Sequence, residues 1–303
     1  MTLKMIWKLS VVAVIFIFSF LVYTLVFYKE HPGNPHRSKV TKHTLKFNKD
    51  IPMLNKHIST EHDIDCSYIH DIIRTRNELS LQLNNMRRLI GQMQCETSKK
   101  KTNQQGGWCK ETSQENSTEH ATDKTLIPQM SKLLSDKTVA SFGDGPEIYK
   151  REIEKLGHFK LYDAFDGAPY CEETSHGRVR FMDLSIPQYG IRQYDWIISL
   201  EVAEHIPKKY EAVYLDNIVR HADEGIILSW AVPGQGGLSH INNKPIEYVT
   251  KVMRDNGFKR DAEKTMKLQT SASLSWIKSN INVYVRNKNA LLGSEGRPHQ
   301  WLI

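Results

Sequence analysis

Strand-like and helix-like segments alternate from Leu126 toward the C-terminus, and this alternation limits the chain to few kinds of fold. Short apolar runs such as 138–142 and 194–200 are separated by longer stretches with a helical period. This alternation is typical of a parallel sheet with helices on its faces. A chain of 303 residues with 40% hydrophobic content can hold one domain of about 150 to 200 residues and a further segment. We therefore expect an α/β domain over residues 125–290 and a tail over 291–303.

An uncharged apolar run lies near the N-terminus. Residues 9–28 read LSVVAVIFIFSFLVYTLVFY, and a helix of about twenty residues rises about 30 Å, which matches a bilayer core. A cleaved signal peptide is the alternative, because Lys4 and Lys8 form a suitable basic region. The run ends in bulky Val-Phe-Tyr rather than in small residues. We therefore interpret residues 1–8 as a short tail and residues 9–28 as a single-pass transmembrane signal anchor.

Two kinds of signal disagree about orientation. Positive charge is heavier after the span than before it, which by itself would place the main domain in the cytoplasm. The N-glycosylation triplet Asn116-Ser117-Thr118 and the even number of cysteines favour an oxidising lumen. We expect a type II membrane glycoprotein of the Golgi or endoplasmic reticulum with a luminal main domain. Topology mapping would separate this orientation from the cytoplasmic one.

The net charge of +7 is concentrated just after the span. Residues 29–65 are rich in Lys, His, Asn and Pro and lack an apolar period, which is typical of an extended linker. Aromatic side chains that could stack on bases are scarce among these basic residues. We therefore predict no nucleic-acid partner. The basic residues of the run are Lys29, Arg37, Lys39, Lys42, Lys46, Lys49 and Lys56.

Residues 66–95 have the pattern of a helical stem. Their apolar residues recur at alternating steps of three and four, with Arg76 as the one interruption, which predicts a helix with an a/d stripe. Such a stem could pair in a homodimeric coiled coil or fold back upon the main domain, and both alternatives stay open. The stripe consists of Ile69, Ile72, Leu79, Leu83, Met86, Ile90 and Met93.

A second polar linker covers residues 96–124, and only Gly106-Gly107-Trp108-Cys109 interrupts it. We expect the linker to be pinned to the domain at Trp108 and Cys109. Four cysteines allow three pairings, and none of their spacings fits a zinc site. Cys109 could reach Cys171 and clamp the linker to the domain. A reduced, buried Cys171 is the alternative.

Two motifs predict a nucleoside site. The segment TVASFGDGPEIY (138–149) turns from a strand-like run through Gly143, Asp144 and Gly145 into a helical stretch. Glycines at such a turn let the backbone approach a ligand and direct amide N–H groups at it, although tight turns use the same residues. About twenty residues later a second run ends at Asp166, where a ribose would find a carboxylate acceptor. Asp163 competes for that role, but alternation places it in mid-strand.

Two further motifs follow in order. The run GRVRFMDL (177–184) ends at Asp183 and Leu184, and the run YDWIISLEVAEHIP (194–207) is a buried strand followed by Glu201 and Glu204-His205. Together the four motifs resemble class I S-adenosylmethionine-dependent methyltransferases, especially those whose fourth strand enters an "slEVlEHi" segment. The resemblance covers about residues 138–285.

The resemblance implies a Rossmann-like sheet of seven strands, the last of them antiparallel, with S-adenosyl-L-methionine across the carboxyl ends of the first strands. By the same resemblance, Glu201 would line the cofactor side of the fourth strand. The other implied cofactor contacts are Gly143, Asp144 and Gly145 to the methionine portion, Asp166 to the ribose, and Asp183 with Leu184 to the adenine.

The first motif departs from the family at two positions. Ser141 stands where an acidic residue is usual, and Glu147 takes the place of a third glycine. Asp144 could supply the missing carboxylate. A degenerate relative that serves as a membrane-anchored binding or scaffold protein is therefore an alternative.

The segment GIILSWAVPGQGGLSHIN (225–242) reads as a fifth strand and a glycine-rich loop. Because ligands in this fold meet the sheet at the carboxyl ends of its strands, the loop should overhang the methyl acceptor. We expect Gln235 and Asn242 to contact the acceptor. His240 and His205 are candidate general bases, because an unperturbed imidazole has a pKa near 6.5. Methyl transfer depends mainly on positioning, so we expect no metal ion.

These features predict a membrane-anchored methyltransferase that O-methylates a glycan or another polar acceptor in the secretory pathway. A cytoplasm-facing enzyme for a small molecule is the second enzymatic alternative. The stem makes a homodimer possible.

Overall fold

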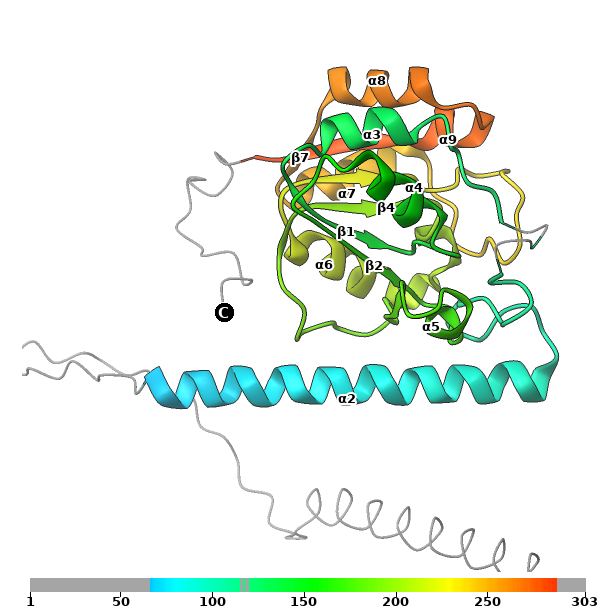
Figure 1. Cartoon of the computed structure of the whole chain (residues 1–303), viewed down its shortest axis with the longest axis vertical. Coiled ribbons are helices and arrows are strands. Elements are labelled where there is room, and N and C mark those ends of the chain that lie inside the picture. Colours follow the sequence, from blue (N-terminus) through cyan, green and yellow to red (C-terminus); the bar gives the residue numbers. More distant parts are fainter. Residues whose placement is uncertain (1–65, 115–116, 118–119, 288–303) are drawn as a thin grey trace, which may run out of the picture. The chain divides into compact units, whose positions relative to one another are not determined.

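A computed structural model describes residues 66–114, 117 and 120–287 (Figure 1). The predicted span, both predicted tails, the 29–65 linker, Asn116 and Thr118 lie outside the described residues. Among the helices that are described, none combines the length and the apolarity that a membrane crossing requires.

A seven-stranded sheet forms the centre of the domain, as the resemblance implies. Its order is β3-β2-β1-β4-β5-β7-β6; neighbours among β1 to β5 pair in parallel, and β7 pairs antiparallel with β5 and β6. The chain reverses its direction across the sheet between β1 and β4, and a ligand crevice is expected at such a point. The strands are β1 (Thr138–Phe142), β2 (Leu161–Asp166), β3 (Arg180–Phe181), β4 (Tyr194–Ser199), β5 (Ala222–Leu228), β6 (Phe258–Arg260) and β7 (Asn282–Arg286).

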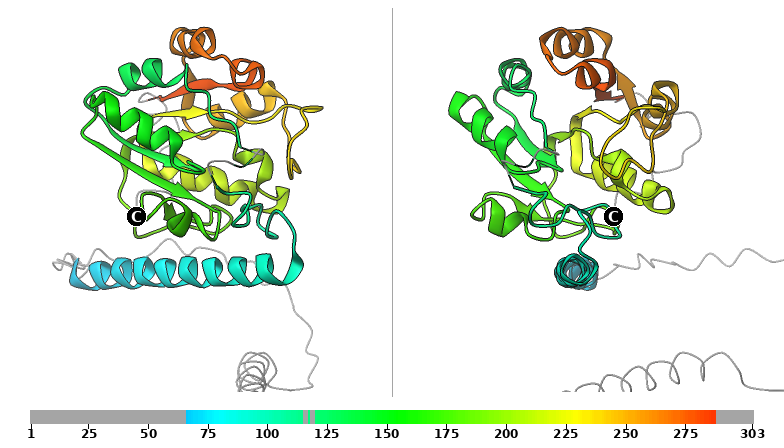
Figure 2. Two further views of the ribbon diagram at one scale, coloured as in Figure 1. Left: turned by 45° about the vertical axis from the view of Figure 1, so that its right-hand side comes forward. Right: turned by 90° about the vertical axis from the view of Figure 1, so that its right-hand side faces the viewer.

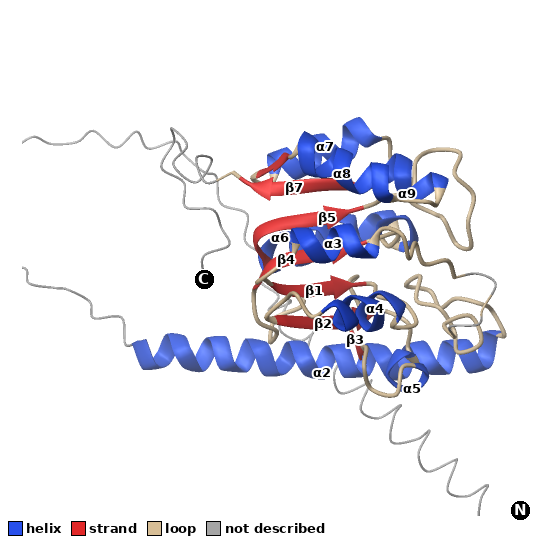
Figure 3. Ribbon diagram, turned by 45° about the horizontal axis from the view of Figure 1, so that its top comes forward, coloured by secondary structure: helices blue, strands red, loops and turns tan. Residues whose placement is uncertain are grey.

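Helices cover both faces of the sheet, because the inner strands are apolar on both sides (Figure 3). One face packs against α3 (Ile127–Leu133), α4 (Ile148–Leu156), α8 (Ala262–Ser271) and α9 (Ser275–Asn280). The other face packs against α6 (Glu211–His221) and α7 (Ile246–Asp255). Three short helical turns complete the domain: α5 (Cys171–Thr174), η1 (Ala203–His205) and η2 (Lys208–Tyr210).

The predicted stem is the long helix α2 (Cys66–Ser98), which lies beside the β3 edge of the sheet (Figure 2). It docks through its polar face. The Asn84 amide donates to the carbonyl of Phe181 at 2.9 Å and accepts from the backbone N–H of Asp183 at 3.0 Å. The Asn84 side chain thus forms hydrogen bonds with backbone groups at the β3 edge of the sheet that would otherwise face solvent.

The apolar stripe of α2 therefore points away from the domain. The stem helix packs against the domain, as the fold-back alternative predicted. The contact is made by its polar face and not by its apolar stripe. Because the structure contains one chain, pairing through α2 stays a prediction. The exposed stripe residues are Ile72, Leu79, Leu83, Met86, Ile90 and Met93.

The polar linker after α2 is held to the stem by a disulfide between Cys95 and Cys109. The suggested Cys109–Cys171 pairing is therefore wrong, and Cys171 is a free, buried thiol. Its Sγ lies 3.6 Å from the carbonyl oxygen of Asp166, inside the apolar core. The chain turns after Asn103 and brings Cys109 back to Cys95. In this turn the backbone N–H of Asn103 donates to the backbone carbonyl of Gly107 at 2.8 Å.

Candidate functional site

A cavity of about 330 Å³ lies at the carboxyl ends of β1, β2 and β4. The strand order makes this the crevice where the first four motifs meet. All but one of the residues expected to bind cofactor or acceptor line it: Gly143, Asp144, Gly145, Asp166, Asp183, Leu184, Glu201, His205, Gln235 and His240.

The turn after β1 approaches β2 closely. The N–H groups of Gly143 and Asp144 donate to the carbonyl of Phe165 at 2.8 and 3.0 Å. Gly143 has a φ of 96°, and a Cβ there would lie 2.2 Å from the Val202 side chain. Only glycine fits this position, because both the backbone angle and the space exclude a side chain.

Asp166 fixes the second half of the turn from the end of β2. Its carboxylate accepts the N–H of Gly145 at 2.8 Å and that of Ala168 at 2.7 Å. Burial raises the pKa of Asp166, and these two amides partly offset that effect. The competing Asp163 instead accepts the Tyr194 hydroxyl at 2.7 Å and does not line the cavity.

The two departures from the family motif have different structural consequences. Asp144 is buried beside Ser141, and its carboxylate accepts the Tyr162 hydroxyl at 3.3 Å. Burial raises the pKa of Asp144 to about 6. The Asp144 carboxylate therefore lies beside Ser141, the position at which the family usually has an acidic residue. Glu147 has a φ of 67° and turns its side chain to Arg178 at 2.5 Å, away from the cavity lining.

The end of β3 is joined to the stem. Nε of Arg87 donates to the carboxylate of Asp183 at 2.7 Å, and the Ser185 hydroxyl donates to the same carboxylate at 2.6 Å. Both Arg87 and Asp183 line the cavity. No sequence signal pointed to Arg87, because it lies on the polar face of a helix far from the motifs along the chain.

The linker covers part of the cavity. A Cβ on Gly106 would lie 2.2 Å from the carbonyl oxygen of His205, so the linker backbone contacts the turn after β4. Trp108 packs edge-on against His205 and His120, with ring centroids 6.1 and 6.0 Å apart. Pinning at Trp108 and Cys109 was predicted, but the covering of the site was not.

Glu201 follows β4 and lines the cavity with a φ of 53°, a strained value for a residue with a Cβ. Gln235 in the glycine-rich loop donates to the Glu201 carboxylate at 2.8 Å. The amide oxygen of Gln235 accepts from Asn280 at 2.6 Å. Gln235 therefore connects β4, the loop and α9, and its amide is held by protein groups on both sides.

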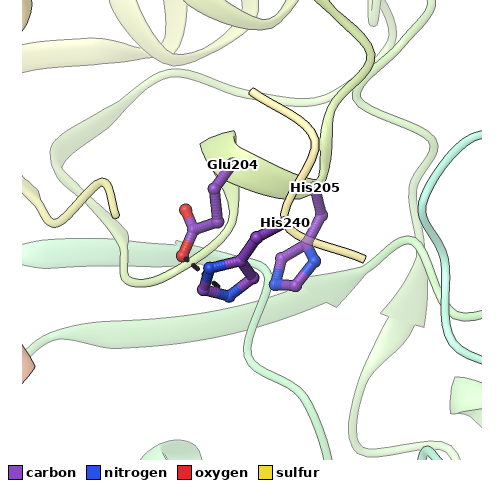
Figure 4. A group of neighbouring side chains, drawn as sticks. All are labelled: Glu204, His205 and His240. Carbon is purple, nitrogen blue, oxygen red and sulfur yellow. Dashed lines mark ion pairs between the residues drawn. The ribbon is translucent and has the colours of Figure 1, made fainter. Parts of the chain in front are cut away.

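Glu204, His205 and His240 converge on one another (Figure 4), and the Glu201 carboxyl is close enough to influence Glu204. Nε2 of His240 lies 4.0 Å from Oε1 of Glu204, and the His205 and His240 rings are 5.0 Å apart. Burial, reinforced by the Glu201 carboxylate, raises the pKa of Glu204 well above its ordinary value. Burial, together with His240, lowers the pKa of His205 to about 4.

Asn242 is the predicted contact that lies elsewhere. Its side chain is 4% exposed and donates to Glu211 at 3.0 Å, while its carbonyl accepts Nε1 of Trp230 at 2.7 Å. It does not line the cavity. Its position gives it a structural contact and does not support an acceptor contact.

Comparison with family models finds no match, and no curated protein matches the chain. Three similar solved structures are methyltransferases. One is magnesium protoporphyrin IX methyltransferase from Synechocystis PCC 6803 with bound SAM (19% identity, 53% of this chain and 76% of that chain, TM-score 0.39). Another is the 1,6-didemethyltoxoflavin-N1-methyltransferase of Burkholderia thailandensis (15%, 55% and 80%, TM-score 0.38). The third is the methyltransferase domain of bacterial CtHen1 (15%, 54% and 95%, TM-score 0.38). At these scores the fold assignment rests on strand order and register.

Proposed function

We propose that this chain is an S-adenosylmethionine-dependent methyltransferase that transfers a methyl group to a hydroxyl of a polar acceptor. The observation that carries the proposal is Asp166, whose carboxylate lies at the end of β2, holds the Gly145 amide and lines the cavity. The adjacent Gly143 turn lines the same cavity, and its positive φ and the neighbouring Val202 side chain leave no room for a Cβ there.

When bound, S-adenosylmethionine supplies a methyl group on a sulfonium. The chain has to hold the acceptor oxygen in line with the methyl carbon and keep water out, and the linker over the cavity serves the second task. In such a transfer the acceptor oxygen would bond to the methyl carbon and the electron pair of the broken bond would stay on sulfur, so a side chain near the acceptor would have to take the hydroxyl proton. His205 is a weak proton acceptor because burial lowers its pKa to about 4. His240 is the better candidate.

The luminal setting and a glycan acceptor belong to the same proposal. The Cys95–Cys109 disulfide supports an oxidising compartment, since disulfides are rare in the cytosol. The sequon at Asn116 and the apolar run over 9–28 support a membrane-anchored glycoprotein of the secretory pathway.

Titration calorimetry with S-adenosylmethionine on the full chain in detergent tests the proposal. We expect saturable binding that is weakened at least about tenfold in Asp166→Ala, because a charge-assisted hydrogen bond is lost. Asp163→Asn is the matched control, as this carboxylate lies outside the cavity lining, and it should bind like the wild type. Absence of binding to a folded wild-type chain would support the alternative of a degenerate scaffold.

A further inference from the structure

Several buried polar atoms at this end of the cavity lack a hydrogen bond of ordinary geometry within the protein. Glu204 is 0% exposed, and its carboxyl oxygens have only looser contacts with the Glu204 and Ala231 backbone and with the Glu201 carboxyl. Nδ1 of His205 and Oε1 of Glu201 are likewise buried without a hydrogen bond of ordinary geometry, and the His205 ring has only looser contacts with the backbone of Leu238 and Ser239. Burying such groups unpaired is costly, and an isolated carboxylate costs the most. A cluster of them points to a ligand of positive charge.

The spacing of these groups fits one small ion. One ligand atom each from Glu204, His205 and His240 lies within 4.8 Å of the other two. Two ligands that are each about 2.1 Å from a metal ion lie about 3 to 4 Å apart. The 4.0 Å between Nε2 of His240 and Oε1 of Glu204 is already in that range. A slight shortening of the distances between the three ligand atoms would bring all of them into that range.

The neighbours of His240 fix its ring as the neighbours of a metal ligand do. Nδ1 of His240 faces the carbonyl oxygen of Gln235 at 3.3 Å, which leaves Nε2 toward Glu204. A backbone carbonyl on the second ring nitrogen is a common support for metal-ligating histidines. Gly237 makes room for the ring, because a Cβ there would lie 2.1 Å from it. The Gln235 side chain also holds Glu201, at 2.8 Å.

We propose that Glu204, His205 and His240 bind a first-row divalent metal ion, with the Glu201 carboxylate beside it. Two imidazoles and one or two carboxylates suit Mn²⁺, Fe²⁺, Co²⁺ or Zn²⁺ better than Ca²⁺ or Mg²⁺, which prefer oxygen ligands throughout. Glu204 closes the back of the site, whereas Glu201, His205 and His240 line the cavity. The open coordination positions therefore face the acceptor. This assignment replaces the sequence-based expectation of no metal.

The ion's role, unlike its binding, rests on the proposed function. A divalent ion lowers the pKa of a hydroxyl that contacts it and orients that hydroxyl. With the ion bound, His240 is a ligand and no longer the proton acceptor. The hydroxyl proton would then pass to the Glu201 carboxylate or to water, the oxygen would bond to the methyl carbon, and the carbon–sulfur electron pair would stay on sulfur. Acceptors with two adjacent hydroxyls, such as sugars, would suit two open positions on the ion.

Cobalt titration of the full chain in detergent tests the site after a chelator has removed bound metal. We expect one saturable site per chain with visible absorption bands, displaced by Zn²⁺ or Mn²⁺. Glu204→Gln and His240→Asn should weaken binding by about 10²-fold or more, because each removes a ligand. The exposed His158→Gln is the matched control and should leave binding unchanged.

Thermal unfolding shows whether a variant that fails to bind cobalt is still folded. Without metal, Glu204→Gln should unfold at the wild-type temperature or above it, since it removes an unpaired buried carboxylate. Metal should raise the unfolding temperature of the wild type and of His158→Gln only. A wild-type chain without a saturable cobalt site, or a folded Glu204→Gln that binds cobalt equally well, would overturn the proposal. S-adenosylmethionine binding, measured separately, shows whether the proposed function fails independently.

Discussion

Arg87 on the stem helix and Asp183 after β3 form an ion pair of 2.7 Å at the edge of the cavity. The two residues are 96 positions apart in the chain. Their side chains are 19% and 7% exposed, so the pair is partly shielded from water. The stem thus contributes to the site as well as connecting it to the N-terminal region.

Replacing Arg87 should therefore lower the stability of the domain. Arg87→Met leaves the buried Asp183 carboxylate without its charged partner, so we expect a loss of about 1–3 kcal/mol in the free energy of unfolding. Urea denaturation measures it. Arg74→Met is the matched control, because the Arg74–Asp71 pair is exposed and contributes less than about 1 kcal/mol. Equal losses in the two variants would contradict a role for Arg87 at the cavity.

The Cys95–Cys109 disulfide should stabilise the linker over the cavity. The two cysteines are 14 positions apart, and closing a loop of that size contributes about 3 kcal/mol. We expect Cys109→Ser to lower the free energy of unfolding by about 2–4 kcal/mol under oxidising conditions and to weaken S-adenosylmethionine binding. A reductant should reproduce both effects in the wild type but change little in the variant. A wild type that is insensitive to reductant would speak against this bond.

The exposed stripe of α2 predicts a homodimer, because its six apolar residues keep a heptad spacing suited to a second copy. Sedimentation of the full chain in detergent should show a dimer. The double variant Leu83→Ser/Met86→Ser should shift it to a monomer, whereas the exposed Asn85→Asp, at a position outside the stripe, should not. A wild type that is monomeric at all concentrations would rule out self-association through the stem.

His221 predicts an acid-sensitive fold. Burial lowers the pKa of His221 from 6.5 to about 4, and its Nδ1 lies 2.7 Å from the Asn217 carbonyl oxygen. The unfolded chain binds the His221 proton more readily than the folded chain does. The free energy of unfolding is therefore at its full value above pH 6.5 and falls as the pH drops from 6.5 toward 4. At about 1.4 kcal/mol per pKa unit, the loss approaches about 3 kcal/mol. His221→Gln should unfold with a shallower pH dependence in that window, and an unchanged slope would contradict the prediction.

Local patterns in the sequence were enough to predict the α/β class, and the resemblance carried by its motifs implied the seven-stranded sheet. The same motifs indicated where the proposed nucleoside site lies. Strand and helix periods are local properties, and the Gly143 turn and Asp166 are recognised by their distance from strand ends. Because parallel strands in this topology end at the same edge, their terminal residues had to meet once the strand order was right.

Contacts between residues that are far apart in the chain could not be predicted from local patterns. The a/d period identified the α2 stripe but not the polar face that docks, since Asn84 and Arg87 look like ordinary solvent-facing residues in the sequence. Cys109 could reach more than one cysteine, and the turn after Asn103 selected Cys95.

His205 and His240 show the same difference between what a local sequence pattern predicts and what tertiary contacts determine. His205 and His240 could be identified from the sequence as candidate general bases, yet their convergence on the buried Glu204 depends on how the loop after β5 closes over the turn after β4. The backbone carbonyl of Glu204 accepts the N–H groups of Ile241 and Asn242 at 2.9 and 3.0 Å, which fixes that closure. Such long-range pairing is set by packing and loop geometry, and a local pattern in the chain does not encode it.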